Sequence, residues 1–173
     1  MNIKLRATVL LAVLLCVNLI ISCQITGQHI IPDMNNVALI PFENNTAEPG
    51  LEGLLMNEVV DQFIADGRLR LVEADRSDVI VRGAIDTYKK IPLIFGEQDI
   101  VEQYRMRIEL SVSLIDSQTE QPLRQFSKIF RETTYSSVIP PRETEFQAQR
   151  RVLRQLSRDV LTSTVDGWPY LDD

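Results

Sequence analysis

The sequence predicts an α/β fold of the α+β type: a two-layer sandwich with a mixed four-stranded sheet and two helices on one face, in the order β-α-β-β-β-α. Three observations support this prediction. Two segments repeat apolar residues at helical spacing, and four segments are apolar or alternate apolar with polar residues, as strands do. A helix separates the first two strands, which makes them parallel, whereas hairpins join the later ones. Because neither helix is apolar all round, we expect no second helical layer.

The first strand and helix lie near the start of the predicted domain. Residues 37–42 form an apolar run in which Pro41 indicates an edge position or an early end. Asn44-Asn45-Thr46 matches a glycosylation sequon, but we interpret it as a turn in which asparagine side chains bond nearby backbone. The helix starts after Gly50, and Gly67 suits the left-handed residue that ends it. Its predicted buried face consists of Leu51, Leu54, Leu55, Val59, Phe63 and Ile64.

An extended segment at 69–72 is followed by three strands, at 79–86, 106–114 and 123–135. The second of these alternates most cleanly, with one buried and one solvated face. The third carries charged residues, as edge strands do. A second helix is expected from about Glu143 to Thr164. Its predicted inward residues are Phe146, Val152, Leu153, Leu156, Val160 and Leu161, and its largely solvated arginines are Arg150, Arg151, Arg154 and Arg158.

The segment of residues 88–103 joins two predicted strands and is far longer than a hairpin requires. Its apolar residues are the candidate partner-binding residues: Ile91, Leu93, Ile94 and Phe95. Three cations near its base are candidates for contacts with phosphate groups: Lys89, Lys90 and Arg105. Two interpretations remain open. Either the tip inserts into a partner, or the strands extend and the apolar residues cover the end of the domain's own core.

The N-terminus has the pattern of a signal peptide, because basic residues precede an apolar stretch that is too short to span a membrane. The sequence Ile20-Ile21-Ser22-Cys23 resembles a bacterial lipobox, which implies that Cys23 carries lipid and becomes the mature N-terminus. The alternative is a secretory signal that is cleaved without lipidation. We predict three parts: a removed signal peptide (1–22), a lipidated N-terminus and tether (23–36), and a single domain (37–173).

Composition limits the functions that the mature chain could have. Removing the signal peptide takes away two of the 18 basic and none of the 24 acidic residues, and the resulting charge of −8 argues against nucleic acid as a partner. It leaves Cys23 as the sole cysteine, so no disulfide is expected. The one histidine, His29, lies in the tether, so a nucleophile in the domain lacks a histidine base and we predict no enzyme activity. The sequence has no cofactor motif and no Cys/His cluster for a metal.

Several motifs carry a family resemblance. The opening Val37-Ala38-Leu39-Ile40-Pro41-Phe42-Glu43-Asn44-Asn45-Thr46, followed by Glu48-Pro49-Gly50-Leu51-Glu52, resembles that of lipopolysaccharide-assembly lipoproteins, the LptE family. The similarity continues through residues 63–69, 74–75, 78–83 and Tyr104-Arg105-Met106, and it ends in an amphipathic helix and Trp168. It covers nearly the whole mature chain. The tether departs from the family pattern, because Gln24-Ile25 follows the lipid cysteine in place of glycine and an aromatic residue.

This resemblance implies a non-enzymatic, lipid-anchored protein of the outer membrane, with its domain facing the periplasm, inside or against a barrel. It implies two partners besides the membrane. One is a large β-barrel translocon (LptD-like), which the protein plugs and helps to assemble, and the other is lipopolysaccharide, which it helps to insert. The alternative is a periplasmic lipoprotein that regulates another envelope complex, such as a peptidoglycan synthase. Co-purification with a barrel or with a synthase distinguishes the two.

Overall fold

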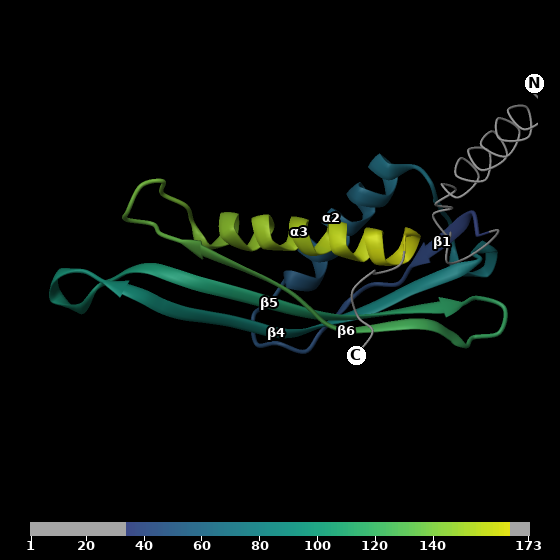
Figure 1. Ribbon diagram of the computed structural model, residues 1–173, viewed down its shortest axis with the longest axis horizontal. Helices are drawn as coiled ribbons and strands as arrows, with labels where there is room; N and C mark the ends of the chain where they lie inside the picture. The colour runs from purple at the N-terminus through teal and green to yellow at the C-terminus, as the bar shows by residue number, and fades with distance from the viewer. Residues whose placement is uncertain (1–33, 167–173) are drawn as a thin grey trace, which may run out of the picture.

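The computed structural model describes residues 34–166, and these form two layers (Figure 1). One layer is a mixed sheet. The other consists of the helices α2 (Leu51–Asp66) and α3 (Glu145–Val165), which lie on the same face of that sheet. The predicted α+β sandwich is therefore confirmed. The sheet in this part of the chain has six strands rather than four, because two short strands add to it.

The first half of the sheet is parallel. β1 (Asn36–Leu39) lies between β3 (Arg70–Leu71) and β4 (Val79–Phe95) and runs parallel to both. β1 ends early, just before Pro41, and the chain rejoins the sheet as β2 (Glu43–Asn44), parallel to β4. The predicted four strands include neither β2 nor β3, although β3 lies within the segment 69–72 that was predicted to be extended, since two paired residues are too few to show a periodicity.

The second half is an antiparallel meander of long strands. β5 (Val101–Asp116) pairs with β4 on one side and with β6 (Pro122–Tyr135) on the other. β6 is therefore an edge strand, as its charged residues predicted. Lys128 has a φ of 64° and lies where the register between β5 and β6 shifts. This irregularity explains why the alternation along β6 is imperfect.

Both helices begin at well-defined residues. Gly50 precedes α2 with a φ of 81°, and Gly67 follows it with a φ of 70° and donates its N–H to the carbonyl of Phe63. Glycine suits both positions because a side chain would be strained there. α3 starts with a capping box: the Thr144 hydroxyl accepts from the N–H of Gln147, whose side chain accepts from the N–H of Thr144.

The core fills the space between the sheet and the helices. Its fully buried side chains include Leu51, Leu55, Val59, Phe63, Val81, Ile85, Ile108, Leu110, Leu114, Leu153 and Leu156. Two residues predicted to face inward are exposed instead, Ile64 by 66% and Phe146 by 54%. Each lies in a terminal turn of its helix, where a neighbour, Phe63 or Ala148, takes the buried position.

Residues 88–103, which we call the arm, differ most from the prediction of a loop. The two strands continue through this segment, so β4 ends at Phe95, β5 begins at Val101, and only residues 96–100 form the turn. Figure 1 shows this hairpin projecting past the ends of both helices. The interpretation in which the strands extend is therefore right about the backbone. The same interpretation also holds that the apolar side chains of the arm cover the core, and their exposure decides whether that is right.

Candidate functional site

The arm ends in a two-stranded ribbon with no further strand beside it in the described part of the chain. β2 accompanies β4 only as far as Ile85, and β6 ends at Tyr135, opposite Tyr104 of β5. Residues 88–92 pair with residues 104–108 of β5, which β6 still accompanies, so only residues 93–103 form a ribbon of two strands. Both edges of this tip are therefore without a strand neighbour, as is common for a projection held on a rigid scaffold.

The apolar residues of the arm do not cover the core. Ile91, Ile94 and Phe95 are 49%, 43% and 56% exposed, and Leu93 is half-buried. Ile100, beyond the turn, is 58% exposed, and sequence reasoning missed it because it stands alone after acidic residues. The interpretation in which these side chains complete the domain's own core is therefore wrong. Clustered exposed apolar residues mark surfaces that interact with other molecules.

Lys89 and Arg105 share the face of the sheet turned away from the helices, which we call the open face. Met106 is buried beneath the helices, so Arg105 and Arg107 on either side of it point to the open face. The strand register sets Lys89 opposite Arg107 and Ile91 opposite Arg105, and residues paired across two strands share a face. Three cations therefore gather on the open face near the base of the arm.

Arg107 is the member of this group that the sequence did not single out. It forms ion pairs of 3.1 Å with both Glu109 and Glu132, and its guanidinium lies 3.7 Å from the centroid of the Phe130 ring. Lys89 and Arg105 have no ion pair or side-chain hydrogen bond with any residue in the range 34–166. Because like charges on facing strands repel, an anion placed between them would be stabilised.

Lys90 lies on the other face of the arm, because consecutive strand residues alternate. Its Nζ is 2.8 Å from Oε2 of Glu145 in α3 and 5.5 Å from the centroid of the Tyr104 ring. The hydrogen bond to Glu145 raises the pKa of Lys90 above its ordinary value. The structure therefore separates the three predicted cations: Lys89 and Arg105 lie together, and Lys90 is already paired.

Glu145 stands at the centre of a polar cluster at the root of the arm. The Tyr88 hydroxyl donates to its Oε1 at 2.6 Å. Nε2 of Gln149 lies 3.3 Å from the Tyr88 oxygen and donates to Oε1 of Glu48 at 2.9 Å. Burial raises the pKa of Glu145, but the hydrogen bonds from Lys90 and Tyr88 outweigh it, so this pKa lies below the ordinary 4.5. The cluster joins β4 to the first turns of α3.

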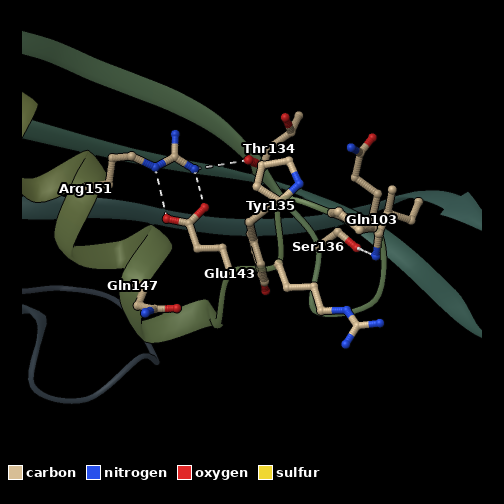
Figure 2. Close-up of a pocket in the computed structure, with 11 residues that line it drawn as sticks. Gln103, Thr134, Tyr135, Ser136, Glu143, Gln147 and Arg151 are labelled. Atoms are coloured by element: carbon tan, nitrogen blue, oxygen red, sulfur yellow. Dashed lines mark hydrogen bonds and ion pairs between the residues drawn. The ribbon is translucent and has the colours of Figure 1, made fainter.

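An open hollow of about 580 Å³ lies beside the arm, between the loop of residues 136–144 and α3 (Figure 2). Ser136 shapes this loop, because its hydroxyl donates to the carbonyl of Glu102 in the arm and accepts from the N–H of Ile139 at 2.7 Å. One wall is the ion pair between Arg151 and Glu143, drawn with dashed lines in Figure 2. The hollow and the root of the arm thus share one end of the domain.

The α3 arginines, predicted to be largely solvated, are mostly paired. Arg150 and Arg154 form ion pairs of 3.1 and 3.2 Å with the buried Glu58 of α2, and Arg151 pairs with Glu143. The two contacts with Glu58 fasten α2 and α3 together. The periodicity of α3 predicted that the arginines point away from the sheet, but a long-range acidic partner leaves no mark in the local sequence.

Three sequence features lie outside the described residues: Cys23 with the rest of the signal peptide and tether, His29, and Trp168. Over residues 34–166, neither helix has the length and apolar character that crossing a membrane requires. In the same range no group of three His, Cys, Asp or Glu side chains is placed to hold a metal ion.

The solved structures that share this fold include the following two. The hypothetical protein CT253 from Chlamydia trachomatis superposes with a TM-score of 0.53 at 11% identity, over 78% of this chain and 97% of that one. The uncharacterized lipoprotein B from Nitrosomonas europaea superposes with a TM-score of 0.51 at 17% identity, over 83% and 93%. Identities this low establish the fold alone. No curated protein matches the sequence.

The sequence also matches the family model of LptE, described as lipopolysaccharide-assembly, over residues 34–164. The matched range includes every strand, α2, and nearly all of α3. It therefore contains the arm, the open-face cations and the cluster around Glu145. On this match, the chain belongs to the LptE family of lipopolysaccharide-assembly proteins.

Proposed function

We propose that this protein is a lipid-anchored subunit of a lipopolysaccharide translocon in the outer membrane. In this role it is not a catalyst. It occupies the lumen of a large LptD-like β-barrel, assists the assembly of that barrel and helps to insert lipopolysaccharide. Family membership supports the role. The observation that supports the mode of contact is the arm, which carries exposed apolar residues to a tip clear of the core.

The tip is the proposed contact with the barrel, through Ile91, Leu93, Ile94 and Phe95. Fully burying one isoleucine or phenylalanine side chain contributes about 1.5–3 kcal/mol. Because Ile94 and Phe95 are about half exposed, docking them against a partner supplies a substantial part of that range for each. The domain by itself buries only part of these side chains, so the burial of the remaining apolar surface is available to an interface.

The proposed contact with lipopolysaccharide is made by Lys89 and Arg105 on the open face. Cations without a protein partner form charge-assisted hydrogen bonds with phosphate oxygens, and arginine can do so with two parallel bonds. Arg107 contributes positive potential beside them, although two carboxylates hold it. Lys90 takes no part in this proposal because it is engaged by Glu145.

The proposed membrane anchor is Cys23, and residues 23–36 form its link to the domain. A single acyl chain gives only marginal membrane binding, so stable attachment requires the multiple acylation that the lipobox implies. With the lipid in the outer membrane, the domain begins on the periplasmic side, from which it reaches the barrel.

Replacing Phe95 with aspartate tests the barrel contact. A charge in a dry interface is costly, so we expect co-purification of the translocon from detergent-solubilised outer membranes to fall strongly, while the thermal midpoint of the domain stays near that of the wild type. Ile64→Asp is the matched control, since Ile64 is at least as exposed as Phe95 and lies on α2, away from the arm. Normal recovery of the barrel with Phe95→Asp contradicts the assignment, and recovery of a peptidoglycan synthase instead of a barrel contradicts the function.

Replacing Lys89 and Arg105 together with alanine tests the phosphate contact. We expect the double variant to bind immobilised lipopolysaccharide more weakly, and the wild-type interaction to weaken as salt rises. Arg82→Ala is the control, because Arg82 is exposed on β4 within the body of the domain rather than beside the arm. Equal losses from Arg82→Ala and from the double variant would mean that binding depends on overall charge rather than on this site.

A further inference from the structure

We infer that Glu145 is the residue that sets the direction of the arm, through its contacts with Tyr88 and Lys90 at the arm's root. The inference rests on the proposed function only in one respect: that the apolar tip and the open-face cations of the arm contact partners. Glu145 is thus a positioning residue: it touches neither the apolar tip nor the open-face cations, and it determines where both of them point.

The first step is that sheet pairing leaves one edge of the arm without support. The body of β4 has neighbours on both sides, but past Ile85 it keeps only β5. β5 keeps β6 as far as Tyr104, so the sheet is three strands wide at Tyr88 and Lys90 and narrows to a two-stranded ribbon beyond Pro92. Such a ribbon is marginally stable by itself and free to twist or bend relative to the sheet from which it grows. Contacts that hold the unpaired edge of β4 at the base of the ribbon therefore limit how far it can bend.

The second step is that such contacts converge on one carboxylate. Tyr88 and Lys90 are two residues apart on β4, so both point toward the helices. Glu145 accepts from Tyr88 at 2.6 Å and from Lys90 at 2.8 Å, one contact for each of two successive inward-facing positions. Two contacts along one strand fix its angle, which a single contact would leave free to pivot. On the loop side, the Ser136 hydroxyl donates a hydrogen bond to the carbonyl of Glu102 in the arm.

The third step is that Glu145 is itself held firmly. It occupies the first turn of α3, directly after the Thr144 capping box, and the negative charge suits the positive end of the helix dipole. Gln149, one turn later, bonds both the Tyr88 oxygen and Glu48. The side chains of Lys90 and Glu145 are 39% and 34% exposed, so water competes only in part with their ion pair. The contacts of Glu145 therefore hold the base of the arm in a constant position relative to α3.

Hydrogen exchange of the full chain in detergent tests this inference. In Glu145→Ala, amides of residues 88–103 should exchange about tenfold faster, since the loss of a charge-assisted bond shifts local opening by about that factor. Amides of α2 and α3 should keep their wild-type rates. Glu143→Ala is the matched control: this acid lies two residues away and pairs with Arg151 rather than with the arm, so arm exchange should not change.

Two further variants make the test specific. Glu145→Gln keeps an oxygen that accepts from Tyr88, so its arm should exchange at an intermediate rate. Lys90→Ala should also accelerate arm exchange, and combining it with Glu145→Ala should add little, because the two residues act through one contact. Unchanged arm exchange in Glu145→Ala overturns the inference, and so does a uniform acceleration across the domain, which would mean a general loss of stability. Because the measurement uses neither barrel nor lipopolysaccharide, its result is independent of the tests of the proposed function.

Discussion

At the scale of single residues, Gly83 shows how closely the chain is packed where β4 passes under the segment after β1. A Cβ at this position would lie 2.6 Å from Cε1 of Phe42 and 2.7 Å from the carbonyl oxygen of Ser111. One of these neighbours is backbone and the other is a buried ring, so neither can yield easily. Gly53 differs, because a Cβ there would have no atom within 4 Å.

Alanine at these two glycines should therefore have opposite effects. Gly83→Ala should destabilise the domain by about 1–3 kcal/mol, as overpacking of a tight site does. Gly53→Ala should stabilise it by about 0.5–1 kcal/mol, because glycine is a poor helix former and Gly53 is exposed in the first turn of α2. Urea unfolding monitored by circular dichroism measures both. The same sign for the two substitutions would show that the close contacts at Gly83 are not restrictive.

The alternation along β5 leads to a second residue-scale prediction. Leu110 is fully buried, and Leu110→Ala should lower the free energy of unfolding by about 2–5 kcal/mol through the cavity it leaves. Ser111 is the control, since its side chain lies on the open face and alanine there should cost less than about 0.5 kcal/mol. Glu109 serves less well as a control because it holds Arg107. Comparable losses at Leu110 and Ser111 would mean that the strand faces are misassigned.

Features fixed by neighbouring residues were predictable from the sequence, and features fixed by distant ones were not. Asn44 forms the predicted turn, because its Oδ1 accepts from the N–H of Thr46 at 3.0 Å and its Nδ2 donates to the carbonyl of Glu48 at 2.8 Å. The ends of α2 follow from its glycines in the same way. In contrast, Glu58 is 92 residues away from Arg150, so no local pattern indicated their ion pair.

At the scale of elements, the arm explains why a paired hairpin was predicted to be a loop. Pro92 and Gly96 are residues that usually interrupt strands, and the charged pair Lys89-Lys90 breaks the apolar alternation. Proline is nevertheless tolerated where a strand has a neighbour on only one side, and β4 becomes such a strand past Ile85. Because strand residues alternate, Lys89 and Lys90 lie on opposite faces of the arm, which the prediction of a loop did not imply.

The link between α2 and α3 predicts how stability depends on pH. Burial raises the pKa of Glu58, but its bonds to Arg154 and Arg150 outweigh burial and leave the pKa below the ordinary 4.5. A carboxyl with a lowered folded-state pKa stabilises the fold above the unfolded pKa, and that stabilisation is lost as pH falls through the folded value. Unfolding free energy should therefore fall on acidification below pH 4.5. In Glu58→Gln the fall should be shallower, and parallel wild-type and variant profiles would refute this cause.

At the scale of the whole molecule, the sequence was sufficient for the architecture and the family but not for the extent of the sheet. Period and turn residues predicted the two layers and the order of the long elements. β2 and β3 were not predicted as strands of the sheet because each has only two residues and is recognised only by its pairing with a neighbouring strand. Of the candidate site, the structure places the apolar residues at an exposed tip and Lys89 and Arg105 on one face, whereas Arg107 and the contacts of Glu145 depend on the register and on the packing of α3.

The outer edge of β4 along the arm has a consequence for how the free protein behaves before it meets a partner. A long bare strand edge normally recruits strands from other copies and leads to self-association. Here Pro92 offers no N–H to an incoming strand, and Lys89 and Lys90 would bring like charges together between two arms. The chain can therefore carry an exposed apolar tip through an aqueous compartment without acting as a template for its own polymerisation. Recognition by the arm then depends on side chains rather than on the addition of a strand.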